Sequence, residues 1–103
     1  MELQSKTTGD TVEFRLIGSV DEAGARELGK AFQKLPDQGV GQVVLDFAAV
    51  TYIGSAGVGK LLLLYKKVAL SGGRISIEHI PGHIHTLLAK DMNLGQLFTL
   101  KQG

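Results

Sequence analysis

The 103-residue sequence contains no cysteine, no tryptophan and no long hydrophobic run. Without cysteine, neither disulfide bonds nor thiolate chemistry is available. The longest apolar run extends from Leu61 to Tyr65, whereas a helix needs about 20 apolar residues to cross a bilayer. The N-terminal segment also lacks the basic flank and the apolar stretch of a signal peptide. These absences predict a cytoplasmic protein that does not insert into a membrane.

The sequence also lacks an excess of charge of either sign. Eleven lysines and arginines stand against ten aspartates and glutamates, for a formal net charge of +1. Surfaces that bind nucleic acid or anionic membranes need a basic excess, so we expect no nucleic-acid partner. Hydrophobic residues make up 44% of the chain and charged residues 20%, a composition that can form a core. The length suits a single domain over residues 1–103.

Five segments are predicted to be strands. Apolar and polar residues alternate over 11–18 and 74–80, as in half-buried strands. A weaker strand over 2–7 is expected to form a hairpin with the first, across a glycine-containing turn. The apolar run at 42–47 predicts a strand in the middle of a sheet. A last strand is expected at 96–100.

Apolar residues at helical spacing predict three helices between these strands. The first spans 21–35, with Asp21 as its N-terminal cap, and the second runs from about residue 56 to residue 70. The third opens at Pro81. Strands and helices thus alternate after an initial hairpin, which predicts an α/β fold with a mixed sheet.

A glycine-rich turn joins the predicted strand and helix in the middle of the chain. Residues 54–60 read Gly-Ser-Ala-Gly-Val-Gly-Lys and fit the first seven positions of a phosphate-binding loop. The eighth position is Leu61, which cannot bind magnesium as serine or threonine does. About six residues also separate the strand at 42–47 from Gly54, although a phosphate-binding loop follows its strand directly. Nucleotide hydrolysis is therefore not expected.

A serine-hydrolase site is not expected either, because Ile53 occupies a position where the nucleophile motif requires glycine. We therefore expect no enzymatic activity. In a purely structural interpretation, Ser55 caps the helix, and Gly57 and Gly59 allow close packing. Each of these glycines costs about 1 kcal/mol relative to alanine within a helix. Close approach of the backbone to a neighbouring strand or to a partner protein would account for that cost.

Residues 43–68, VVLDFAAVTYIGSAGVGKLLLLYKKV, resemble the signature of the STAS family, the sulphate-transporter and anti-sigma-factor-antagonist domains. The signature is an apolar strand, Asp, a short stretch, an aromatic or apolar pair, and Asp-Ser-small-Gly-apolar-Gly leading into a helix. The residues that fall on it are Asp46, Tyr52, Ile53, Ser55, Ala56, Gly57, Val58, Gly59, Leu61 and Leu62. The similarity covers essentially the whole chain, through Gly18, Asp21, Gly72, Gly73, Pro81, Leu94, Leu97 and Phe98.

The resemblance implies a single-layer mixed sheet of four to five strands with helices mainly on one face, and no cofactor. It also implies a switch. In stand-alone bacterial members, a cognate serine kinase that is also an anti-sigma factor phosphorylates the serine of the motif. The unphosphorylated form binds this kinase and frees the sigma factor, and a serine phosphatase resets the phosphorylated form. By this resemblance Ser55 is the phosphoacceptor.

The partner-binding surface is expected to surround Ser55. Besides a loop at Ala48 and Ala49, it would comprise Asp21, Gly54, Ala56, Gly57, Gly59 and Lys60. Gly54 departs from the family, which has Asp before the serine. This departure leaves open an alternative, in which the chain is a constitutive interaction subunit of a transport or signalling assembly and is not phosphorylated.

The remaining polar residues are expected to be structural or solvated. His79, His83 and His85 could suggest a metal site, but no acidic or cysteine ligand is expected near them, so no metal is predicted. A solvated face is expected for Lys60, Lys66 and Lys67. The phenylalanines and Tyr65 are expected to pack in the core.

Overall fold

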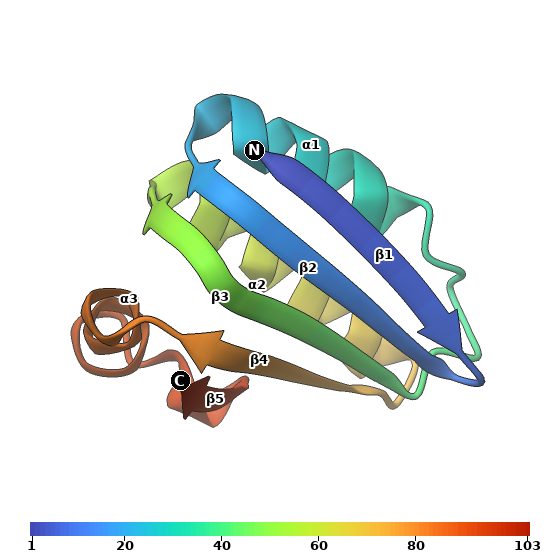
Figure 1. Ribbon diagram of the computed structural model, residues 1–103. Coiled ribbons are helices and arrows are strands. Elements are labelled where there is room, and N and C mark those ends of the chain that lie inside the picture. Colours follow the sequence, from blue (N-terminus) through green and yellow to red (C-terminus); the bar gives the residue numbers. More distant parts are fainter.

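The computed structural model describes residues 1–103 as one five-stranded sheet with helices (Figure 1). The elements follow the order β1 (Glu2–Thr8), β2 (Thr11–Val20), α1 (Glu22–Gln33), β3 (Gln42–Ile53), α2 (Ser55–Leu70), β4 (Arg74–Ile80), α3 (Gly82–Thr86), the π-helical turn η1 (Leu87–Asp91), the 3₁₀ turn η2 (Leu94–Gln96) and β5 (Thr99–Gln102). The strand order in the sheet is β1-β2-β3-β4-β5. Because β1 is antiparallel to β2 and the other pairs are parallel, the predicted mixed α/β sheet is confirmed.

The expected N-terminal hairpin is also confirmed. Thr8 pairs with Thr11 across a two-residue turn, in which Gly9 has a φ of +61° and Asp10 has no positive φ. Glycine at the first central position is the signature of a type II′ turn, whose twist matches that of the strands it joins.

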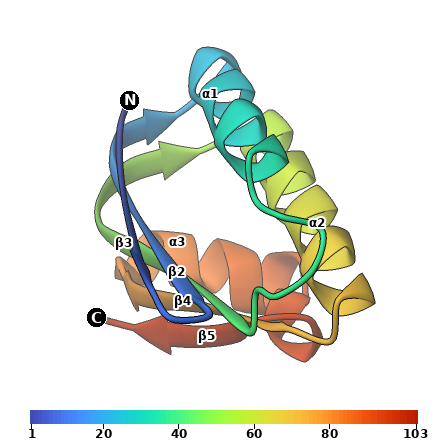
Figure 2. The same cartoon turned by 90° about the vertical axis from the view of Figure 1, so that its right-hand side faces the viewer.

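The helices cover one face of the sheet. Figures 1 and 2 show α1 and α2 side by side over that face, with α3 near β4 and β5. A core of 23 buried hydrophobic residues fills the space between the two layers. All four phenylalanines are at most 5% exposed, and Tyr65 packs edge-on against Phe98 with ring centroids 5.8 Å apart. The predicted packing of the aromatic residues is therefore confirmed. No helix is both long and apolar enough to cross a membrane.

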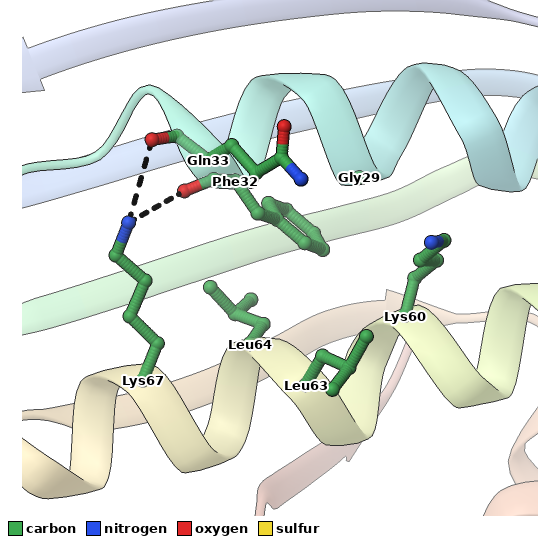
Figure 3. A pocket seen from close by; sticks show the side chains of 7 residues that line it. All are labelled: Gly29, Phe32, Gln33, Lys60, Leu63, Leu64 and Lys67. Carbon is green, nitrogen blue, oxygen red and sulfur yellow. Dashed lines mark hydrogen bonds between the residues drawn. The ribbon is translucent and has the colours of Figure 1, made fainter.

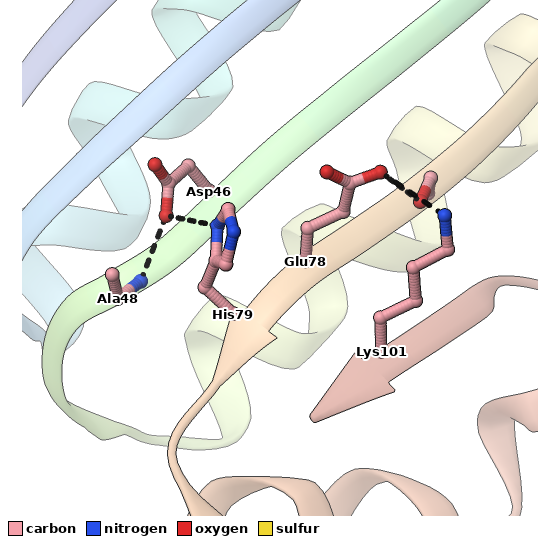
Figure 4. A network of polar contacts seen from close by, with 6 residues as sticks. Asp46, Ala48, Glu78, His79 and Lys101 are labelled. Atoms are coloured by element: carbon pink, nitrogen blue, oxygen red, sulfur yellow. Dashed lines mark hydrogen bonds and ion pairs between the residues drawn. The ribbon is translucent and has the colours of Figure 1, made fainter. Parts of the chain in front are cut away.

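The opposite face of the sheet carries polar side chains (Figure 4). Asp46 Oδ1 lies 3.3 Å from His79 Nδ1. Glu78 Oε2 accepts a hydrogen bond of 3.1 Å from the Ser76 hydroxyl and lies 3.5 Å from Lys101 Nζ. This face can therefore remain in contact with water without exposing a large apolar surface.

Strand β3 is longer than expected, because it continues through the predicted loop at Ala48 and Ala49 as far as Ile53. Its pairing with β2 shifts register twice, as at β-bulges. Asp46 Oδ1 accepts a 2.9 Å hydrogen bond from the Ala48 amide and so stabilises the first irregularity. The prediction rested on the apolar run at 42–47, and beyond Phe47 the bulges leave no regular alternation of buried and exposed residues that would extend it.

The last strand was predicted too early in the chain. The structure places β5 at Thr99–Gln102 rather than at 96–100, because η2 occupies Leu94–Gln96. Asn93 enters that turn with a φ of +51°, a conformation that Asn adopts more readily than most residues. A single turn of this kind leaves no periodic signal in the sequence.

Candidate functional site

Ser55 is the first residue of α2, and only Gly54 separates it from the end of β3. Gly54 is the N-cap residue, with an extended backbone and no capping side chain. The prediction that Ser55 caps the helix is therefore wrong. Ser55 is exposed instead and belongs to the first turn of α2, whose amides have no partner within the helix.

The parallel pairing of β2 and β3 brings two helix N-termini together. Val20, the last residue of β2, is in register with Ile53, and the Gly54 amide donates a 3.1 Å hydrogen bond to the Val20 carbonyl. Each strand then leads directly into a helix, α1 after β2 and α2 after β3. The first turns of α1 and α2 consequently border a common open hollow of about 510 Å³, lined by Asp21, Glu22, Tyr52, Gly54, Ser55 and Ala56.

Four of the predicted site residues are thus brought together in this hollow, namely Asp21, Gly54, Ser55 and Ala56. Asp21 caps α1 as predicted, since its Oδ1 accepts a 2.9 Å hydrogen bond from the Gly24 amide. Glu22 and Tyr52 were not predicted to belong to this surface. The position of Glu22 next to a predicted helix cap was the available signal, because acidic residues favour the first turn of a helix.

The two glycines of α2 have different surroundings. Gly57 is buried, and a Cβ atom there would lie 2.8 Å from Val20 Cγ1 and 2.9 Å from Ile53 Cγ1. Close packing against the strand ends is therefore confirmed for Gly57. A Cβ atom on Gly59 would meet nothing within 4 Å, so packing within the chain does not account for Gly59.

Lys60 and Lys67 lie outside the hollow, in the groove between α1 and α2 (Figure 3). The side chain of Lys60 passes over Gly29, where a Cβ atom would be 3.1 Å from Lys60 Cε. Lys67 Nζ donates hydrogen bonds of 2.7 Å to the Leu35 carbonyl and 3.2 Å to the Phe32 carbonyl. The predicted solvated face is wrong for Lys67, which binds a carbonyl in the last turn of α1 and another just beyond the helix.

The length of β3 also bears on whether the glycine-rich turn could bind phosphate. Because β3 reaches Ile53, no gap separates the strand from the glycine-rich turn, and that argument against a phosphate-binding loop is wrong. Leu61 nevertheless does not fit a phosphate-binding loop. Leu61 is fully buried in the core, so its position offers no hydroxyl for a magnesium ion.

The three histidines do not converge. His79 belongs to β4 and lies against Asp46, so the expectation of no nearby acidic group is wrong for this residue. His83 Nε2 lies 3.3 Å from the Thr51 carbonyl oxygen. No group of three or more His, Cys, Asp or Glu side chains is arranged as a metal site.

Comparison with known proteins identifies the family. The family model described as "Mlab, STAS domain" matches residues 3–98. A candidate anti-sigma factor antagonist of Bordetella bronchiseptica, BtrV, is 31% identical over 83 residues, which cover 77% of this chain and 72% of BtrV.

Several solved structures share the fold. A candidate anti-sigma factor antagonist of Thermotoga maritima is 19% identical, with a TM-score of 0.86 over 98% of this chain and 86% of its own. The phosphorylated form of the Bacillus cell fate determinant SpoIIAA is 19% identical, with a TM-score of 0.73 over 96% of this chain and 90% of its own. The structure of Mglu is 26% identical, with a TM-score of 0.64 over 72% of this chain. The matched region covers only 18% of the Mglu chain. With both the family model and BtrV covering most of its length, this chain belongs to the STAS domain family.

Proposed function

We propose that this protein is a protein-binding switch of the anti-sigma factor antagonist type, controlled by phosphorylation of Ser55. The observation that carries the proposal is the position of Ser55, which is exposed at the first residue of α2 in an open hollow. The similarity to BtrV supports the proposal. Its partner would be a serine kinase that is also an anti-sigma factor, and a serine phosphatase would reverse the modification.

The electrostatics of the hollow suit a modification that leaves the fold intact. A phosphoserine carries about −1.5 to −2 charges and three acceptor oxygens. The first turn of α2 contains no acidic residue, so a phosphate there would be stabilised by the free amides and by the helix dipole. Phosphorylation should therefore change the surface of the protein more than its stability.

The same phosphate would strongly change a docked surface. Asp21 and Glu22 already line the hollow with Ser55, so the new charge would add to two carboxylates. A partner that docks on the unmodified hollow would meet both extra bulk and concentrated negative charge. A loss of about 3 kcal/mol in binding free energy weakens association more than 100-fold, which is sufficient for a switch.

Gly54 and Tyr52 bear on how a kinase would recognise the site. A Cβ atom on Gly54 would lie 2.9 Å from the Tyr52 hydroxyl. The tyrosine side chain therefore occupies the space that a side chain at position 54 would need. Tyr52 is 54% exposed. We infer that its ring and hydroxyl form the surface beside Ser55 that an aspartate at position 54 forms in the family motif.

The second candidate function is a constitutive interaction subunit of a transport or signalling assembly. Gly54 favours this function, because the family motif has an aspartate at this position, directly before the phosphorylated serine. Such a subunit would bind its partner through the same hollow and would not be modified.

A release experiment separates the two functions. The tagged protein is used to capture its partner from the native cells, and the washed complex is incubated with magnesium and ATP. The switch predicts phosphorylation of Ser55 and release of the partner, whereas a Ser55→Ala variant should retain the partner under the same conditions. A Thr51→Ala variant, which removes another exposed hydroxyl near the end of β3, is the matched control and should behave as the wild type. A partner that stays bound to the wild type with ATP would favour the constitutive subunit.

A further inference from the structure

Strand β1 presents a long and regular free edge. It forms one edge of the sheet and pairs only with β2 (Figure 1). The register runs without a bulge from Glu2 to Thr8, and the strand contains no proline. All of its residues are exposed except Leu3, which is partly buried. Edges of this kind pair readily with another strand unless a structural feature prevents it.

The hairpin turn determines which backbone groups point outward. In a turn of this type the Thr8 carbonyl pairs with the Thr11 amide, so Thr8 is bonded to β2. Backbone groups alternate in direction along an antiparallel strand, so the other even-numbered residues of β1 are also bonded to β2. The amides and carbonyls of Leu3, Ser5 and Thr7 therefore face away from the sheet.

The side chains of β1 complement a second copy of the same strand. Glu2, Gln4 and Lys6 share the face that carries no helices, where Gln4 Nε2 donates a 2.8 Å hydrogen bond to Glu2 Oε2. If two copies pair antiparallel about a two-fold axis at Gln4, the outward groups of Leu3 meet those of Ser5 in the other copy. The same register places Glu2 opposite Lys6 of the other copy, twice by symmetry. Neither residue is in an ion pair within the chain.

The helix-covered face beside this edge has room for the second strand. A groove of about 410 Å³ between β1 and α1 is lined by Leu3, Val12, Phe14, Ala31 and Leu35 together with polar residues. Side chains of Leu3 and Ser5 from the added strand would cover part of this apolar lining. The groove shares no residue with the hollow around Ser55.

We propose that the protein forms a two-fold dimer through antiparallel pairing of β1 with β1 of a second copy. The two five-stranded sheets then join into one continuous sheet, with two Glu2–Lys6 ion pairs across the dimer axis. Because the hollow around Ser55 is not part of this interface, the dimer and the proposed switch are independent.

Charge exchange tests the register. Sedimentation equilibrium from micromolar to millimolar concentration should show a dimer for the wild type. Lys6→Glu and Glu2→Lys each replace two attractive cross-strand pairs by two repulsive ones and should weaken dimerisation about 10- to 100-fold. The double variant Glu2→Lys/Lys6→Glu restores complementary pairs and should recover the wild-type affinity. Lys101→Glu on β5, at the opposite edge, makes the same change in net charge as Lys6→Glu and should have no effect on dimerisation.

A backbone variant tests the edge itself. Ser5→Pro removes an amide that faces away from β2, so circular dichroism should show a folded protein while the dimer is lost. A wild-type protein that remains monomeric at all concentrations would overturn the proposal and identify Lys6 as a charge that prevents edge pairing. A dimer that tolerates both Lys6→Glu and Ser5→Pro would also overturn it, because its interface would lie elsewhere.

Discussion

At the scale of single residues, the surroundings of Ser55 combine residues with structural roles and residues to which the proposed switch assigns a function. Asp21 caps α1 and also lines the hollow, so its carboxylate is available to a partner without losing its structural role. Gly57 is buried and acts through packing. Ser55 makes no structural contribution as a cap. A hydroxyl that the helix does not need is free to be modified.

Alanine substitutions at the two glycines of α2 should have opposite effects. Gly57→Ala places a methyl group less than 3 Å from Val20 and Ile53 and should lower the free energy of unfolding by about 1–2 kcal/mol. Gly59→Ala meets open space and should raise it by about 0.5–1 kcal/mol through helix propensity. Urea denaturation of the two variants provides the measurement. Stabilisation by Gly57→Ala would contradict the packing described for Gly57, and destabilisation by Gly59→Ala would contradict the open space beside Gly59.

Substitutions at Asp21 should separate its two roles. Asp21→Ala removes the acceptor of the Gly24 amide and should cost about 1 kcal/mol of stability. Asp21→Asn keeps an oxygen acceptor and should retain most of that stability. If the charge of Asp21 contacts the partner, Asp21→Asn should still weaken partner binding. Unchanged affinity in this variant would restrict Asp21 to its role as a cap.

At the scale of elements, two features of the structure had no signal in the sequence. The apolar run at 42–47 predicts a strand that ends before Ala48, whereas β3 continues through two bulges to Ile53, and residues beyond Phe47 show no regular alternation. The hydrogen bonds from Lys67 to the Phe32 and Leu35 carbonyls, at and just beyond the end of α1, join residues 32 or more positions apart. Local patterns cannot predict such a contact, because it depends on how the helices pack.

Lys67 should therefore matter more for stability than its neighbour Lys66. Lys67→Met retains most of the aliphatic volume but removes the donor to the Phe32 and Leu35 carbonyls, and should cost about 1–2 kcal/mol. Lys66 is exposed, so Lys66→Met should change the free energy of unfolding by less than about 0.5 kcal/mol. Chemical denaturation compares the two variants. Equal effects would show that Lys67 does not stabilise the end of α1.

At the scale of the whole molecule, the order of strands and helices could be predicted because the apolar periodicity changes from one element to the next. The parallel pairing of β2 with β3 then brings the starts of α1 and α2 together. This explains why motif residues as distant as Asp21 and Ser55 share one hollow. That Tyr52 and Glu22 also line the hollow could not be predicted from the sequence. Their positions depend on the second bulge in β3 and on the direction of α1.

The central claim concerns the modification of Ser55, and the intact mass of the protein purified from its native cells tests it most directly. The account predicts a fraction of molecules with one added phosphate, located at Ser55 by fragmentation and missing from a Ser55→Ala variant. A protein that carries no phosphate during growth, stress and stationary phase, or that carries it at another residue, would contradict the account.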